Sequence, residues 1–178
     1  MDTNGFWTLI EDARSQLPDL ADSNALAHQA SSLLAARPRA EIIAGQQALW
    51  DLMAASYRSP LWAAAYVING GCSDDGFDYF RGWLILQGRD TFERVLADPD
   101  ALAELPAIRA AAADGADIDG EEALSIAWNA HETATGEELP ADVFTIRYPN
   151  LDPDWNFDFD DQAEMRHRLP RLTALYQY

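Results

Sequence analysis

Hydrophobic residues recur at every third or fourth position along most of the chain, which is the spacing of helices with one buried face. The first such stripe starts after Asp2 or Thr3, stops at Pro18 and comprises Phe6, Ile10, Ala13 and Leu17. A second stripe follows Asp22 or Ser23, either of which can cap a helix, and a third and broader one follows Pro38. The first third of the chain therefore predicts three helices.

The segment LWAAAYVI, residues 61–68, contains no charged residue, so we expect a helix that is apolar on every side and runs through the middle of the fold. Asn69, Gly70 and Gly71 are expected to end it, because glycine adopts the left-handed cap conformation without a steric penalty. A second apolar helix starts within a few residues and ends at Gly88. Two buried helices joined by so short a loop pack as an antiparallel pair or meet at a sharp corner.

Weaker patterns follow in the second half of the chain. Residues 110–120 are rich in alanine, aspartate and glycine without a large apolar face, so they predict a mobile connector. Residues 143–148 alternate between apolar and polar side chains and form the one segment that predicts a strand. An acidic, aromatic loop comes next, and then a final helix over residues 161–176 that is broken or kinked at Pro170.

Together these patterns predict a mainly α protein: a single compact multi-helix domain with a central antiparallel buried helix pair and an irregular C-terminal segment that packs back on it. The length of 178 residues fits one domain with its own core. We expect the helical core to span about residues 1–139 and a C-terminal extension to span about residues 140–178.

The composition adds a strong negative charge. Thirty acidic residues against twelve basic ones give a net charge of −18, and every basic residue is an arginine. So many carboxylates oppose close approach to phosphate backbones and anionic lipid, so no nucleic acid and no membrane is expected as a partner. The start MDTNGFW lacks the features of a signal peptide, and no apolar run reaches the roughly 18 residues of a membrane span. We therefore expect a cytoplasmic protein.

Five stretches of the chain carry a resemblance to a known family. They are DTNGFWTLIEDAR at the start, LWAAAYVINGGCSDDGFDYFRGWLILQGR in the middle, and DPDALAELP, TGEELP and RLPRLTALY farther on. In these stretches, which span nearly the whole chain, it resembles the bacterial family catalogued as domain of unknown function 4240. The resemblance implies a small, mostly helical, cytosolic bacterial protein, and it implies no reaction.

The candidate chemistry lies in the stretch INGGCSDDGFDYFRGW, residues 68–83. Cys72 is the only cysteine of the chain, which excludes an internal disulfide and fits a reducing compartment. A thiol just ahead of a helix N-terminus can ionise early. However, Asp74, Asp75 and Asp78 place negative charges within one helical turn and oppose the thiolate. We therefore expect a buried, unreactive Cys72.

Asp74, Asp78 and Arg81 are spaced to share one face of an otherwise apolar helix. One hypothesis is structural, with Asp78 paired to Arg81 and an aspartate at the helix cap, so that the network fixes the corner. The other is functional: Arg81 binds a small anionic ligand, or the aspartates hold a divalent cation. The aromatic side chains expected to line such a site are Trp62, Tyr66 and Tyr79.

A second metal candidate is DPDWNFDFDD, residues 152–161, whose acidic and amide side chains alternate like those of a calcium loop. Phe157 stands where that loop needs a glycine and Ala163 where it needs a bidentate glutamate, so we expect no specific metal site. Instead, Trp155, Phe157 and Phe159 are expected to pin the loop onto the helices while its aspartates stay in water.

His131 shares a face with apolar residues and is expected to be a hydrogen-bonded core histidine. The chain has no glycine-rich phosphate loop and no nucleophile-elbow serine, and we expect no cofactor. Two function classes stay open. The first, which we favour, is a non-enzymatic interaction or regulatory module whose acidic surface meets an unknown basic protein. The second is a small-molecule-binding protein or hydrolase-like enzyme that uses the Asp/Arg cluster in a helical cleft.

Overall fold

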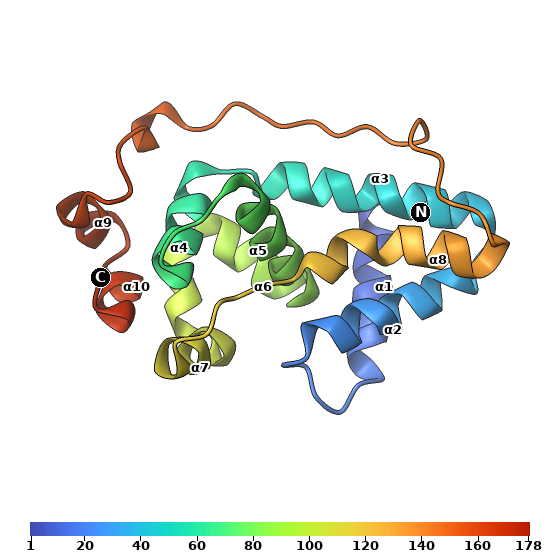
Figure 1. The fold of residues 1–178 in the computed structure, drawn as a ribbon, viewed down its shortest axis with the longest axis horizontal. Coiled ribbons are helices and arrows are strands. Elements are labelled where there is room, and N and C mark those ends of the chain that lie inside the picture. The colour runs from blue at the N-terminus through green and yellow to red at the C-terminus, as the bar shows by residue number, and fades with distance from the viewer.

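The computed structural model describes all 178 residues and consists of helices and their connections, with no strand (Figure 1). In chain order the α-helices are α1 (Thr3–Ser15), α2 (Ser23–Ala35), α3 (Arg39–Ser56), α4 (Ser59–Asn69), α5 (Asp74–Leu86), α6 (Arg89–Ala97), α7 (Pro106–Asp114), α8 (Ile126–Thr135), α9 (Gln162–Arg168) and α10 (Pro170–Tyr176). Three short 3₁₀ helices are η1 (Pro99–Glu104), η2 (Glu121–Ser125) and η3 (Pro153–Trp155). The mainly α prediction is confirmed. No helix is both long and apolar enough to cross a membrane.

The predicted helix starts in the first third are confirmed by their caps. Asp2 Oδ1 accepts a hydrogen bond from the backbone N–H of Gly5 at 2.8 Å, and Asp22 Oδ1 accepts one from that of Ala25 at 2.9 Å. Each carboxylate satisfies an N–H group that has no partner within its helix. The helix α3 begins directly after Pro38.

The buried pair α4 and α5 lies at the centre of the fold. Gly70 ends α4 in the left-handed conformation, with a φ of 64°, as its lack of a side chain predicts. Trp62, in the first turn of α4, stacks on Phe77, in the first turn of α5, with ring centroids 4.7 Å apart. The connecting loop therefore folds back along α4, and the two helices meet at a sharp corner. Trp62 and Tyr66 are half-exposed, so α4 is not buried on every side.

The remaining helices form two groups around this pair (Figure 1). At one end, α1, α2, α3 and α8 pack on one another, and at the other end η1 contacts α4, α6, α7 and α10. One continuous hydrophobic core runs through both groups.

A close approach of two glycines joins α5 to η2. A Cβ atom added to Gly82 would lie 2.6 Å from the carbonyl oxygen of Gly120, and one added to Gly120 would lie 2.3 Å from the backbone nitrogen of Trp83. Side chains at either position would force the two backbones apart.

The segment 110–120 is more ordered than the predicted connector. Its first half continues α7 to Asp114, and Gly115 ends that helix with a φ of 65°. Its second half is held by Asn69, whose side chain accepts from the backbone N–H of Ile118 at 2.9 Å and donates to its carbonyl oxygen at 3.1 Å. The alanines that gave no large apolar stripe are nevertheless good helix formers.

The predicted strand at 143–148 is wrong. This stretch is extended, but its partner is a side chain: Gln47 accepts from the backbone N–H of Thr145 at 2.7 Å and donates to its carbonyl oxygen at 3.2 Å. A strand needs a neighbouring strand to pair with, and the chain offers none. The whole segment between α8 and α9 runs over the outside of α3 and back to the far end of the molecule (Figure 1). The predicted break of the last helix is confirmed, since α9 ends at Arg168 and α10 starts at Pro170.

Candidate functional site

Arg81 lies on α5, where this helix contacts the end of α3, and is 0 % exposed. Its Nη1 donates to the carbonyl oxygen of Met53 at 2.5 Å, its Nε donates to that of Phe77 at 3.3 Å, and its Nη2 donates to the Asp78 carboxylate. The guanidinium carbon also lies 5.1 Å from the ring centroid of Tyr57 and 4.7 Å from that of Phe77. The cation is therefore enclosed by an ion pair, two carbonyl groups and two aromatic rings.

The C-terminal segment covers this ion pair from outside. Tyr148 Oη donates to the second carboxylate oxygen of Asp78 at 3.4 Å, and the Tyr148 ring meets the Tyr57 ring edge-on with centroids 4.9 Å apart. Burial lowers the pKa of Arg81, and the nearby Asp78 carboxylate offsets this effect. An arginine stays charged at neutral pH in such surroundings because its usual pKa is so high. The pKa of Tyr148 is raised, first by burial and then by Asp78.

Asp74 and Asp75 take no part in that network. Both are exposed in the first turn of α5, and the arginine pairs only with Asp78. The cap of α5 is Ser73, whose hydroxyl accepts from the backbone N–H of Gly76 at 3.1 Å. The predicted cluster is thus divided, with one aspartate on the arginine and two facing solvent.

Cys72 is half-exposed, not fully buried as expected. Its Sγ lies 3.7 Å from the carbonyl oxygen of Ser73. Burial raises the pKa of the thiol to about 11, while Arg81 lowers it and Asp74 raises it further by smaller amounts. A suppressed thiolate agrees with the expectation of an unreactive thiol, but the main cause is loss of hydration and not the aspartates.

A hollow of the surface lies beside Cys72, between α4 and the segment 151–159. It has a volume of about 560 Å³ and is lined by Ser59, Trp62, Tyr66, Cys72, Leu151, Asp152, Pro153, Trp155, Asn156, Phe157 and Phe159. We call it the aromatic groove, because five of these side chains are aromatic rings. Trp62 and Tyr66, which we expected to line a site beside Arg81, line this groove instead, and Arg81 does not. The third expected lining residue, Tyr79, lies elsewhere, near Glu121, whose carboxylate raises the pKa of the Tyr79 hydroxyl.

Hydrogen bonds hold two rings of the aromatic groove, those of Trp62 and Tyr66, in place. Trp62 Nε1 donates to the carbonyl oxygen of Cys72 at 3.0 Å, and Tyr66 Oη donates to Asp160 Oδ1 at 2.7 Å. This bond to Asp160, together with burial, raises the pKa of Tyr66 to about 12. The Tyr66 ring also meets the Phe159 ring edge-on at 5.7 Å. Their polar atoms are thus engaged, and their ring faces are left to form the wall.

The aromatic side chains of the segment 151–161 pack against the core as predicted. Trp155, Phe157 and Phe159 are half-buried against the core, and the aspartates of the segment are exposed. Three of these aspartates, Asp152, Asp158 and Asp161, each accept a hydrogen bond from the backbone N–H two residues farther along the chain. No group of three or more histidine, cysteine or acidic side chains in the structure is placed to hold one metal ion.

His131 is the hydrogen-bonded core histidine that the sequence predicts. It is 0 % exposed, its Nε2 lies 3.1 Å from Arg39 Nε, and its Nδ1 lies 2.9 Å from the carbonyl oxygen of Glu137. Arginine only donates, so Nε2 is the acceptor and Nδ1 carries the proton. The imidazole is therefore engaged on both sides.

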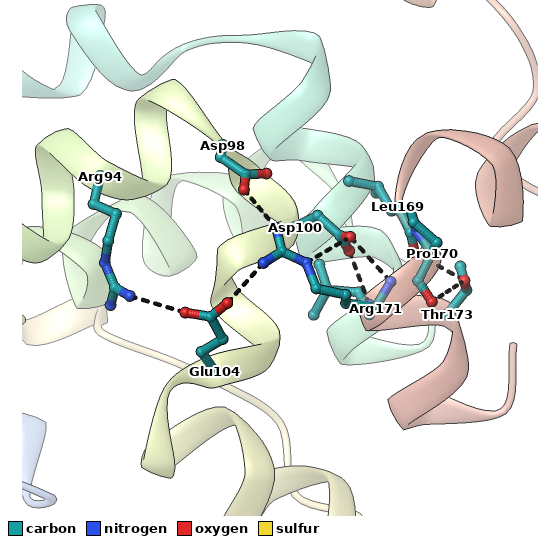
Figure 2. A network of polar contacts seen from close by, with 9 residues as sticks. Arg94, Asp98, Asp100, Glu104, Leu169, Pro170, Arg171 and Thr173 are labelled. Carbon is teal, nitrogen blue, oxygen red and sulfur yellow. Dashed lines mark hydrogen bonds and ion pairs between the residues drawn. The ribbon is translucent and has the colours of Figure 1, made fainter.

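A second charged network escaped the sequence analysis (Figure 2). Arg171, at the start of α10, pairs with Asp98, Asp100 and Glu104 through its three guanidinium nitrogens. Asp100 is 5 % exposed and also accepts from the backbone N–H groups of Arg171 at 3.0 Å and Leu172 at 2.9 Å. This network ties α10 to η1, which lies about 70 residues earlier in the chain.

A family model described as "Protein of unknown function (DUF4240)" matches residues 1–133, which is well over half of the chain. The chain belongs to the DUF4240 family. The matched residues include Arg81 and α4, whereas the segment 151–159 lies beyond them. Two of the stretches that carried the resemblance, TGEELP and RLPRLTALY, also lie wholly beyond them. Searches among curated proteins and among solved structures found no significant match.

Proposed function

We propose that this DUF4240 protein is a non-enzymatic interaction module that binds a basic segment of a partner protein. The observation that carries the proposal is the aromatic groove, an open hollow with five aromatic rings and a carboxylate in its wall. Hollows of this size and apolar character are typical of binding sites. On a protein with a net charge of −18, a positively charged partner is attracted from a distance and a negatively charged one is repelled.

The alternative, a site for a small anionic ligand or a hydrolase centred on Arg81, has less support. The guanidinium is fully buried and already bound to Asp78, so an incoming anion would have to displace that carboxylate. The nearest nucleophile, Cys72, has a raised pKa, and its Sγ contacts the carbonyl oxygen of Ser73. A carbonyl oxygen cannot take up the thiol proton, whereas a catalytic thiol needs a neighbouring base that does.

Four defined probes test the proposal by isothermal titration calorimetry. They are an arginine–glycine repeat peptide, the matched glutamate–glycine peptide, inorganic phosphate and duplex DNA. We expect binding of the arginine peptide alone. This binding should weaken severalfold between about 50 mM and about 300 mM NaCl, because salt screens the attraction. Lack of arginine-peptide binding at low salt, or binding of phosphate that is lost in Arg81→Met, would contradict the proposal.

A further inference from the structure

Resting on the proposed function, we propose that the aromatic groove takes one arginine side chain of an extended segment in the partner protein, with the guanidinium against the rings and paired to Asp152. Three features of the groove support this occupant. They concern the affinity of its rings for guanidinium, the distribution of charge along it, and its continuation into a second hollow.

The rings already bind a guanidinium group from the same chain. Arg168 lies with its guanidinium carbon 4.8 Å from the ring centroid of Trp155 and 4.9 Å from that of Phe157. The same two rings line the groove. Aromatic rings attract cations through their faces, and arginine stacks on them better than lysine because its guanidinium is planar.

Charge in the groove is placed for a cation. Among the residues that line it, Asp152 is the one charged side chain, and no arginine or histidine is present. The Asp152 side chain is exposed, and Oδ1 accepts one hydrogen bond from the backbone N–H of Asp154 at 2.9 Å, which leaves Oδ2 free to pair. A carboxylate beside ring faces is the combination that binds a guanidinium through both charge and stacking.

A second hollow of about 290 Å³ continues the groove past Asp152, along the start of α4. Asp152 lines both hollows, so a chain laid across them would pass this carboxylate. The second hollow is lined in part by Arg58, which would repel a cation. We therefore expect the partner's guanidinium to bind in the aromatic groove and not in the second hollow. A second copy of this protein is a poor occupant, because two molecules of charge −18 repel each other.

The first test compares two neutralising variants with the arginine–glycine peptide. Asp152→Asn keeps an oxygen that can accept from the backbone N–H of Asp154, but it removes the charge from the groove. Asp154→Asn removes the same charge from an exposed position in the same segment that does not line the groove. We expect Asp152→Asn to weaken peptide binding about tenfold and Asp154→Asn to weaken it less than about twofold.

The second test uses Cys72, which lines the groove and is the only cysteine. Saturating peptide should slow the alkylation of Cys72 by iodoacetamide at about pH 9 at least fivefold, because the bound segment covers the thiol. N-acetyl-arginine amide, a single arginine, should bind at least tenfold more weakly than the peptide, because it cannot reach the second hollow.

Failure of the site and failure of the proposed function give different results. If the peptide binds, but Asp152→Asn and Asp154→Asn weaken binding equally and Cys72 stays unprotected, the site is wrong and the interaction module stands. If the single arginine binds as tightly as the peptide, a small-molecule site replaces the extended partner segment. If no arginine peptide binds at low salt, both the proposed function and the proposed site are wrong.

Discussion

Arg81 is the one arginine of the chain that is fully buried, and its surroundings account for how a charge can persist there. Burial alone would be costly, but an ion pair, two carbonyl oxygens and two ring faces replace the lost water. The pairing with Asp78 was predictable, because the two residues are three positions apart on one helix. The contact of Arg81 with Met53 and its cover by Tyr148 were not predictable. These two residues lie 28 and 67 positions from Arg81 in the sequence, and only the fold brings them close to it.

Cys72 should react slowly with iodoacetamide in the folded protein. Because its pKa is raised to about 11, two units above the usual 9.0, the thiolate fraction near neutral pH is about 100-fold lower than in the unfolded chain. The alkylation rate should rise with pH up to about 11 in buffer, but level off near the ordinary thiol pKa in denaturant. Equal rates in the two states at pH 7.5, which lies well below the ordinary thiol pKa of 9.0, would contradict the hydration argument.

At the scale of elements, helix boundaries were the most predictable feature. Asp2, Asp22 and Gly70 act through their own backbone neighbours, and such local effects can be read from a sequence. The strand expected at 143–148 failed because strand formation depends on a distant partner. Trp155, Phe157 and Phe159 were correctly expected to face the helices, yet nothing in the sequence indicates that they face α4.

The contact of α5 with η2 should make Gly82 intolerant of any side chain. In an open helix, Gly→Ala is stabilising by up to about 1 kcal/mol. Gly82→Ala should instead lower the free energy of unfolding by about 1 to 3 kcal/mol, because the new Cβ would lie 2.6 Å from a backbone oxygen. Gly76→Ala is the control in the same helix, where the nearest atoms are side-chain atoms at 3.4 Å and beyond. Urea denaturation should show the control to be neutral or more stable, and equal effects at both glycines would refute the close contact.

The tie between α10 and η1 should depend on Asp100. Asp100→Ala removes the acceptor of three hydrogen bonds, so we expect the free energy of unfolding to fall by about 2 to 3 kcal/mol. Amide hydrogen exchange should also become faster in α10 before other helices, because this helix loses its anchor. The matched control is Asp114→Ala, an exposed aspartate at the end of α7, which should be neutral. Unchanged exchange in α10 would show that the network does not hold this helix.

For the whole molecule, the excess of thirty acidic over twelve basic residues should make stability depend on salt. Raising NaCl to about 0.5 M should increase the free energy of unfolding by about 1 kcal/mol and Tm by about 2 to 4 °C, because screening reduces the self-repulsion of the folded state.

Calcium chloride and magnesium chloride at equal ionic strength should change the stability by equal amounts. A saturable shift with calcium alone, lost in Asp154→Asn, would contradict the expected lack of a metal site in residues 152–161.

We propose that the ion pair of Arg81 with Asp78 is a closed structural network, which leaves the aromatic groove as the place for recognition. The most direct test is a double-mutant cycle of Arg81→Ala, Asp78→Asn and the double variant in denaturant unfolding. Arg81→Ala should cost about 3 to 5 kcal/mol, because it leaves a carboxylate without its buried partner. Arg89→Ala, which breaks an exposed pair with Glu93, should cost less than about 1 kcal/mol. We expect the Arg81 and Asp78 changes to be coupled by at least about 1 kcal/mol. Additive effects with a total below about 1 kcal/mol would contradict it, and would make Arg81 a group that awaits a ligand.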